Sequence, residues 1–346
     1  MTADRADPNL RGSLLGLVMA FTASQVIHVG TRLGIPDLLA DGPKSSDELA
    51  KATGAEPSAL YRLLRGLACL GVAEESEAGR FALTGFGAPL RADHPDSVRN
   101  ATLFYCGTRT WENWGHLLDS VQTGKPVYQL HNRPGPFEGA SEEFWTVFNV
   151  AMSEGTRQAA SGVAGSYDFS RFRTVVDVGG GDGTLIGAIL RANDGLRGML
   201  FDRPAGIKEA PSRLAELGVA DRCLVVAGDF FSSVPEGGDA YLLKSVIHDW
   251  DDGHATAILA NCRQVMPSHG RLLVLEAILP PKIGPSPEMT GAVLAGDLNM
   301  LVSTGGRERT EAEFSSLFEA AGFRLSGTSA VPAPAAYLSV IEGIPT

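Results

Sequence analysis

The chain has 346 residues, and its 40 acidic side chains against 29 Lys and Arg give a formal net charge of −11. Hydrophobic residues make up 44% and charged residues 20%, which is the balance of a globular protein rather than a disordered one. This length predicts about two domains. The excess of negative charge argues against sequence-independent binding of nucleic acid, which needs clustered positive charge.

The cysteines and the N-terminal segment predict a cytoplasmic protein. The four cysteines are Cys69, Cys106, Cys223 and Cys262. They form no C-x-x-C pair, so we expect buried thiols in a reducing compartment rather than disulfides or a zinc site. The first ten residues lack the basic region of a signal peptide. Residues 12–31 carry no formal charge but include several polar side chains, so we expect an amphipathic buried helix and no membrane contact.

The N-terminal part has the pattern of short helices followed by a hairpin. Helices are predicted to start near Ser46 and Pro57, and the charged residues 74–80 are predicted to be the turn of a hairpin. This is the outline of a winged helix, which DNA-binding regulators share. The second helix offers only Arg62 and Arg65 to phosphates, so we favour a dimerisation or lid module.

Aromatic residues are concentrated between residues 100 and 150, which hold nine of the 25 aromatic side chains. Such a cluster is typical of a core or a dimer interface. It is equally typical of the wall of a pocket for a flat apolar ligand, and both interpretations stay open at this point.

From residue 166 onward, short apolar segments alternate with helical patterns. The predicted strands are residues 174–178, 198–202, 224–227, 240–243 and 272–275. Apolar strands that alternate with helices predict a parallel sheet covered on both faces. Ligands bind such sheets at the carboxyl ends of the strands.

A glycine-rich segment, DVGGGDGT, follows the first of these strands. Its glycines leave room for a ligand close to the backbone. The spacing fits NAD poorly, because Thr184 stands where a dinucleotide fingerprint has its third glycine. Asp177 and Asp182 favour a cationic ligand over a pyrophosphate.

Side chains at the following strand ends suit an adenosine with a cationic amino-acid tail, which is S-adenosylmethionine. Asp202 suits the ribose hydroxyls, and Asp229 with Phe230 suits the amine and ring of a purine. Lys244 could neutralise a carboxylate, with a surface lysine as the alternative. Taken singly, an Asp at a strand end is usually a helix cap or part of a turn.

The segment LLKSVIHDWDD contains the best candidate for a general base, His248. A neutral imidazole can take the proton of a hydroxyl group near pH 7. Glu276 and Glu308 are candidates to orient this imidazole and stabilise its charged form. Alternatively, the acidic residues 249–252 mark a helix N-terminus with His248 as a bystander, and Glu308 begins the helix marked by Thr310.

The segments DVGGGDGT, GDFF, LLKSVIHDWDD, LLVLEAILP and GGRERT, in this order, resemble the small-molecule O-methyltransferases. This family includes the plant caffeic-acid type and antibiotic-tailoring enzymes of actinobacteria, and the resemblance covers nearly the whole chain. It implies an α/β protein with a Rossmann-like methyltransferase domain at residues 166–346. A winged-helix-like dimerisation domain is expected at residues 1–100, with a helical region at 101–165 that lines the acceptor pocket.

The resemblance also implies roles for particular residues. The implied cofactor contacts are Gly179, Gly181, Asp202, Asp229, Phe230 and Lys244. The implied catalytic residues are His248 as base with Glu276 and Glu308 as its supports. The implied acceptor contacts are Phe148, Met152, Asn299 and Met300. No metal ligand is expected, and the partners are an aromatic small molecule and a second copy of the chain.

The expected reaction is transfer of a methyl group from S-adenosylmethionine to a hydroxyl of an aromatic or polycyclic secondary metabolite. Some members of the family bind this cofactor yet hydroxylate or decarboxylate, and a winged-helix DNA-binding regulator is a further alternative. The stretch before GGRERT lacks the longer Asn-Pro-type segment of plant members. Plant acceptor preferences therefore do not transfer to this chain.

Overall fold

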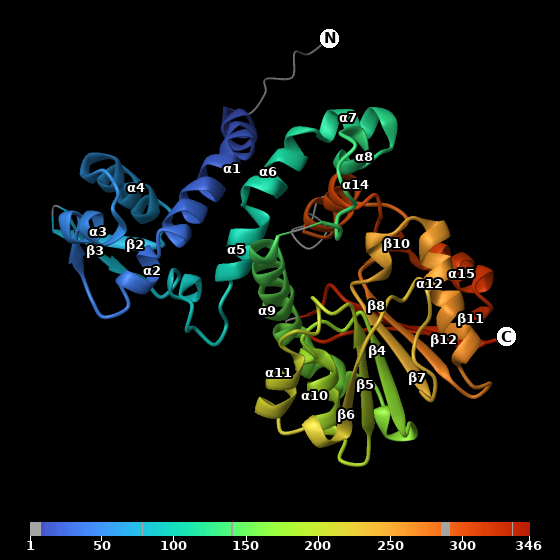
Figure 1. Ribbon diagram of the computed structural model, residues 1–346. Helices are drawn as coiled ribbons and strands as arrows, with labels where there is room; N and C mark the ends of the chain where they lie inside the picture. The colour runs from blue at the N-terminus through green and yellow to red at the C-terminus, as the bar shows by residue number, and fades with distance from the viewer. Residues whose placement is uncertain (1–7, 78, 140, 285–290, 334) are drawn as a thin grey trace, which may run out of the picture. The chain divides into compact units, whose positions relative to one another are not determined.

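The computed structural model describes residues 8–77, 79–139, 141–284, 291–333 and 335–346. The chain divides into two compact units, Met1–Trp111 and Glu112–Thr346. Each unit is described by itself, with the elements labelled as in Figure 1.

The first unit packs short helices against a small sheet. Its elements are α1 (Pro8–Arg32), α2 (Ile35–Leu38), β1 (Lys44–Ser45), α3 (Ser46–Thr53), α4 (Pro57–Cys69), β2 (Ala73–Glu77), β3 (Arg80–Leu83) and α5 (Arg99–Tyr105). Ser45 and Glu48 form a capping box at the start of α3. Leu49, Leu64 and Phe81 are fully buried between these helices and the sheet. The predicted helix starts and the hairpin are confirmed.

The charged hairpin segment differs from the prediction. Residues 74–77 belong to strand β2, which pairs with β3 in the order β1-β3-β2, and they do not form a turn. Because β2 is an edge strand, its side chains at residues 74–77 stay exposed and solvated. Charged side chains are a common feature of such edges, where they oppose pairing with other chains.

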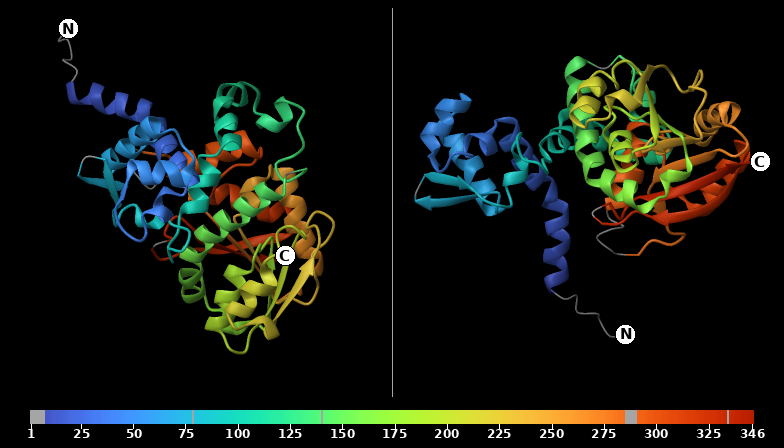
Figure 2. Two further views of the ribbon diagram at one scale, coloured as in Figure 1. Left: turned by 60° about the vertical axis from the view of Figure 1, so that its left-hand side comes forward. Right: turned by 90° about the horizontal axis from the view of Figure 1, so that it is seen from below.

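The prediction that residues 12–31 form a buried amphipathic helix is wrong for a single copy of the chain. Helix α1 does form, but Leu14, Leu17 and Val18 are 64%, 75% and 61% exposed. Figure 2 shows the N-terminal half of α1 projecting beyond the other helices of its unit. Apolar side chains lie all around this half, so no single stripe faces a core. Within the described ranges, Gly12–Arg32 is the one helix long and apolar enough to span a membrane by length and composition.

The second unit contains a seven-stranded sheet in the order β11-β12-β8-β7-β4-β5-β6 (Figure 1). Its strands are β4 (Thr174–Val178), β5 (Arg197–Asp202), β6 (Cys223–Ala227), β7 (Ala240–Lys244), β8 (Arg271–Glu276), β11 (Phe323–Ala330) and β12 (Ser339–Pro345). The five predicted strands are confirmed and run parallel. Of the two unpredicted strands, β12 pairs antiparallel with β8 and β11 pairs antiparallel with β12, so the sheet is mixed.

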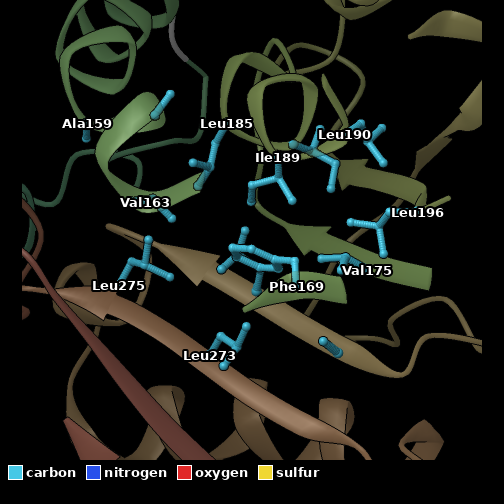
Figure 3. Packing of buried hydrophobic residues seen from close by; sticks show 14 of the residues in the cluster. Ala159, Val163, Phe169, Val175, Leu185, Ile189, Leu190, Leu196, Leu273 and Leu275 are labelled. Carbon is cyan, nitrogen blue, oxygen red and sulfur yellow. The ribbon is translucent and has the colours of Figure 1, made fainter. Parts of the chain in front are cut away.

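Helices cover both faces of this sheet. One face is covered by α9 (Glu142–Ser166), α10 (Thr184–Ala192) and α11 (Ala210–Glu216), and the other by α12 (Asp252–Val265) and α15 (Glu311–Ala320). Alternate strand residues point to opposite layers, so Val175 joins the first core and Val176 the second. Figure 3 shows Phe169 packed among side chains of the first core, including Val163 and Ile189.

The strand order places a switch point between β4 and β7. From β4 the chain builds outward through β5 and β6, then returns to the other side of β4 with β7 and β8. At such a point the loops after adjacent strands diverge and leave a crevice at the carboxyl edge of the sheet. The glycine segment follows β4 and the segment containing His248 follows β7, so both lie at this edge.

Candidate active site

The glycine loop after β4 approaches the loop after β7 closely. Gly179 has a φ of 75°, a backbone conformation that favours glycine. A Cβ atom there would lie 2.8 Å from Cγ2 of Val246 and 3.8 Å from the Phe230 ring. Gly179 thus lies where three predicted site segments meet.

Asp202, at the tip of β5, is held by the glycine loop. Its Oδ2 accepts a hydrogen bond from Gly181 N at 2.9 Å, and its Oδ1 accepts one from Arg203 N at 2.6 Å. Burial raises the pKa of Asp202. A Cβ on Gly206 would lie 2.7 Å from the carboxylate carbon. Gly206 therefore keeps room for this side chain, a requirement that the sequence pattern did not reveal.

Two buried groups of opposite charge flank this loop. Asp177 is almost fully buried, and its Oδ2 has no hydrogen-bond partner among the residues that the structure describes. Burial and the charge of Asp202 raise the pKa of Asp177 to about 7. Burial lowers the pKa of Lys244, whose Nζ donates to Ser245 Oγ at 3.1 Å. Lys244 is therefore not an exposed surface lysine.

Two of the acidic residues have local structural partners. Asp182 accepts a hydrogen bond from Thr184 N at the start of α10 and another from Ser153 Oγ at 2.7 Å. Asp229 is exposed, and its Oδ1 accepts from Phe231 N at 3.0 Å, as in a turn. Asp182 and Asp229 thus accept the helix-start and turn hydrogen bonds that are common for an Asp at a strand end.

A carboxylate at the end of β8 organises the loop after β7. Glu276 is 1% exposed, and its Oε1 accepts hydrogen bonds from the backbone N of Val246, Ile247 and His248 at 3.0, 2.9 and 3.3 Å. The residue before this group, Ser245, has a φ of 53°, which is uncommon for a residue other than glycine. The backbone therefore turns sharply after β7 toward Glu276.

The imidazole of His248 lies between two carboxylates. Its Nδ1 is 2.8 Å from Glu308 Oε1 and 3.4 Å from Glu276 Oε2. The other ring nitrogen, Nε2, is therefore the one left to contact a substrate. Burial lowers the pKa of His248, but the negative charges of Glu276 and Glu308 outweigh burial and raise it to about 10. Glu308 is itself held by a hydrogen bond from its backbone N to Asp297 Oδ1 at 3.0 Å.

The sequence left open whether the residues around His248 and Glu308 mark helix starts or belong to a site, and different residues fill these two roles. Asp251 caps α12 by accepting from His254 N at 2.9 Å, so the acidic residues do mark a helix start. His248 lies before this cap in a short 3₁₀ turn, Ile247–Asp249, and is held independently. Thr310 caps α15, and Glu308 precedes that helix.

His248, Glu276 and Glu308 also offer ligand atoms within 4.8 Å of one another, a group that could hold a metal ion.

Aromatic side chains connect helix α9 to the loop that contains His248. The Phe148 ring centroid lies 5.8 Å from that of Phe137, which lies 6.0 Å from that of Trp250. The Trp250 ring in turn lies edge-on to Phe230, with centroids 6.1 Å apart. Met152 follows Phe148 by one helical turn and is half-buried. The predicted acceptor residues of α9 thus share a helix that reaches the loop containing His248 through Phe137.

The other predicted acceptor residues, Asn299 and Met300, begin α14 (Asn299–Ser303), directly after a π-helical segment, Gly291–Leu298. Asn299 is buried, and its Oδ1 accepts from Trp114 Nε1 at 3.3 Å, which leaves the amide N–H groups as donors. The Met300 carbonyl accepts from Gly305 N at 2.8 Å and so ties α14 to the GGRERT segment.

Comparison with known proteins identifies this arrangement. An O-methyltransferase domain matches residues 114–324, and an O-methyltransferase dimerisation domain matches residues 15–90. The chain belongs to the O-methyltransferase family. The methyltransferase is 43% identical over 338 residues to phenazine O-methyltransferase PhzM of Lysobacter antibioticus, covering 97% of this chain and 96% of that protein.

Two further relatives show the range of the family. A solved O-methyltransferase from neocarzinostatin biosynthesis, in complex with S-adenosylmethionine and 2-hydroxy-5-methyl naphthoic acid, superposes with a TM-score of 0.80 at 33% identity, covering 93% of this chain and 96% of that one. An 8-amino-8-demethylriboflavin N,N-dimethyltransferase of Streptomyces davaonensis is 38% identical, covering 87% of each chain. The family therefore includes enzymes that methylate nitrogen.

Replacing Glu308 by Gln should lower the pKa of His248 from about 10 toward its ordinary value of 6.5, because the variant removes one of the two charges that favour the imidazolium. NMR titration of labelled histidine would measure this shift. Glu319→Gln, on the exposed surface of α15, should leave the value near 10. An unchanged pKa in Glu308→Gln would show that Glu308 does not act on the imidazole.

Proposed function

We propose that this O-methyltransferase moves a methyl group from S-adenosylmethionine to a hydroxyl of an aromatic or polycyclic secondary metabolite, with His248 as general base. The observation that carries the proposal is the geometry of one imidazole. Its Nδ1 is held 2.8 Å from Glu308, its Nε2 is left for an acceptor, and its loop contacts the glycine loop at Val246.

The residues at the carboxyl edge of the sheet fit S-adenosylmethionine. The turn at Gly179 has no room for a side chain. The buried Oδ2 of Asp177 has no hydrogen-bond partner within the described chain. Asp202 would hold the ribose hydroxyls, Phe230 the adenine face and Lys244 the carboxylate of the tail. When bound, the cofactor supplies an electrophilic methyl carbon on a positively charged sulfur.

The two carboxylates beside His248 act on its role as base. Their negative charges raise the pKa of His248 to about 10, so only the small fraction of the enzyme that has a neutral imidazole can accept a proton near pH 7. When Nε2 takes the proton of an acceptor hydroxyl, Glu308 and Glu276 stabilise the imidazolium that results. Alignment of the acceptor lowers the activation barrier more than the base does. Positioning can supply about 7–11 kcal/mol, whereas a general base usually contributes about 10²–10⁴-fold in rate.

The aromatic residues and the base support an aromatic acceptor with a hydroxyl group. Phe137, Phe148 and Trp250 form a connected set of rings suited to a flat apolar ligand. A neutral aromatic amine can attack through its lone pair, whereas a hydroxyl gains much more from losing its proton. A base supported by two carboxylates thus favours oxygen over nitrogen as the methylated atom.

A DNA-binding role is disfavoured by the charge of the winged-helix-like unit. Strand β2, in the position of a wing, exposes Glu74, Glu75 and Glu77. Helix α4 exposes Arg62 and Arg65, and Arg65 lies over the ring of Tyr61. Three exposed carboxylates at the wing repel the phosphates that such a module must contact.

His248→Ala should lower the rate of methyl transfer about 10²–10⁴-fold, the usual contribution of a general base. The dissociation constant of S-adenosylhomocysteine should change little, because the glycine loop is untouched. Transfer of labelled methyl from cofactor to product measures the rate, and calorimetry measures the affinity. His254→Ala, an exposed histidine paired with Asp251, is the matched control. Equal loss of rate and affinity would mean that His248 shapes the cofactor site instead.

Catalysis is proposed to need no metal ion. Enzyme treated with EDTA and then desalted should retain its full rate of methyl transfer. Excess Zn²⁺ should inhibit, because His248, Glu276 and Glu308 offer it ligand atoms within 4.8 Å of one another. Loss of activity on chelation that Mg²⁺ or Zn²⁺ restores would contradict metal independence.

The dimerisation domain indicates a homodimer, and we propose that the exposed half of α1 is buried in it. Each fully buried Leu or Val contributes about 1.5–3 kcal/mol, so a joint Leu14→Glu and Leu17→Glu substitution should shift the protein to a 36.4 kDa monomer in sedimentation. Leu224→Glu, 60% exposed on the edge strand β6, is the control and should leave the dimer intact. A dimer that survives the α1 substitutions would exclude this helix from the interface.

A further inference from the structure

Four consecutive residues of the GGRERT segment contact the loop that contains His248, each in a different way. A Cβ on Gly306 would lie 1.9 Å from the His248 carbonyl oxygen, so only glycine lets the two backbones approach this closely. The backbone N of Arg307 donates to the same carbonyl at 2.8 Å. Glu308 contacts the imidazole, and Arg309 contacts the backbone on both sides of it.

Arg309 is fully buried, which is exceptional for a guanidinium group. Its Nη1 donates to the carbonyl of Ile247 at 3.1 Å, and its Nη2 donates to the carbonyl of Trp250 at 2.8 Å. These two carbonyls bracket His248 in the chain. The charge of Arg309 is paired with Asp252, whose Oδ1 lies 2.8 Å from Nη2 and 3.1 Å from Nε. A buried guanidinium with this many acceptors holds its partners firmly.

The base loop is thus held from two sides by buried groups of opposite charge. The carboxylate of Glu276 accepts its N–H groups at residues 246–248, and the guanidinium of Arg309 donates to its carbonyl groups at residues 247 and 250. Glu276 also lies beside the imidazole, whereas Arg309 donates to two backbone carbonyl groups of this loop and to Asp252. Its influence on the imidazole therefore passes through the backbone.

We propose that Arg309 is a positioning residue that sets where the imidazole of His248 lies relative to the acceptor. The inference rests on the proposed role of His248 as base. A base acts only within hydrogen-bond reach of the proton that it removes, and a displacement of about 1 Å can cost about 10²-fold in rate. Since Arg309 makes no hydrogen bond to the glycine loop within the described residues, its loss should affect turnover far more than cofactor binding.

The test compares Arg309→Lys and Arg309→Met with the intact enzyme. Lysine keeps the charge but lacks the planar fork by which Nε, Nη1 and Nη2 of Arg309 reach Asp252 and both carbonyl groups together. Arg309→Lys should lower kcat about 10-fold and Arg309→Met about 10²-fold. The dissociation constant of S-adenosylhomocysteine should stay within about twofold. A parallel loss of affinity and kcat, or an unchanged kcat in both variants, would overturn the proposal.

A matched control separates positioning from general stability. Arg222 also donates to several backbone carbonyls, those of Leu190, Asn193, Asp194 and Leu196, but at the opposite edge of the sheet where β5 begins. Arg222→Met should lower the melting temperature without lowering kcat at a temperature where the variant is folded. If Arg222→Met lowers kcat as much as Arg309→Met does, the effect is one of stability and the proposal is wrong.

A double-variant cycle distinguishes failure of this inference from failure of the proposed function. If Arg309 acts through the imidazole, Arg309→Lys should lower kcat little further in a His248→Ala background. An equal, additive loss in that background would show that Arg309 acts elsewhere. The single His248→Ala variant tests the proposed role of His248 as general base. An unchanged rate of methyl transfer in that variant would refute this role, whatever the effect of Arg309→Lys.

Discussion

The carboxylate of Glu276 is the group on which the arrangement of the site depends. It ends β8 beside β7, where Lys244 is paired with Leu275, and it accepts three backbone N–H groups from the loop after β7. A buried carboxylate without donors would be costly, so the loop must turn to supply them. The pairing of two core strands thereby determines where His248 lies, and its position depends on the sheet rather than on the loop alone.

The same carboxylate also acts on the pKa of the imidazole. Glu276 and Glu308 both face one ring, and their negative charges raise the pKa of His248 to about 10 despite burial. Acidic groups at the glycine loop, such as Asp202, suit a positively charged cofactor.

The first unit exposes an apolar surface on the N-terminal half of α1. The exposed half of α1 would be unfavourable in an isolated chain, and contiguous apolar patches of this kind mark interaction sites. The dimerisation-domain match over residues 15–90 includes most of this helix. The prediction of burial rested on the polar side chains among residues 12–31, and the exposed apolar side chains of α1 contradict it for a single copy.

The sequence by itself determined the local structure and the chemistry of the site. Apolar runs predicted the five parallel strands, and the residue types at their ends pointed to a sulfonium nucleoside and to His248 as base. Strand β11 escaped prediction because it is largely exposed and has few apolar residues to form a pattern. Only the tertiary structure decided which residues meet. Glu276 and Glu308 reach His248 across 28 and 60 positions of sequence, and Arg309 reaches Ile247 across 62. Such contacts depend on strand order, which local periodicity does not encode.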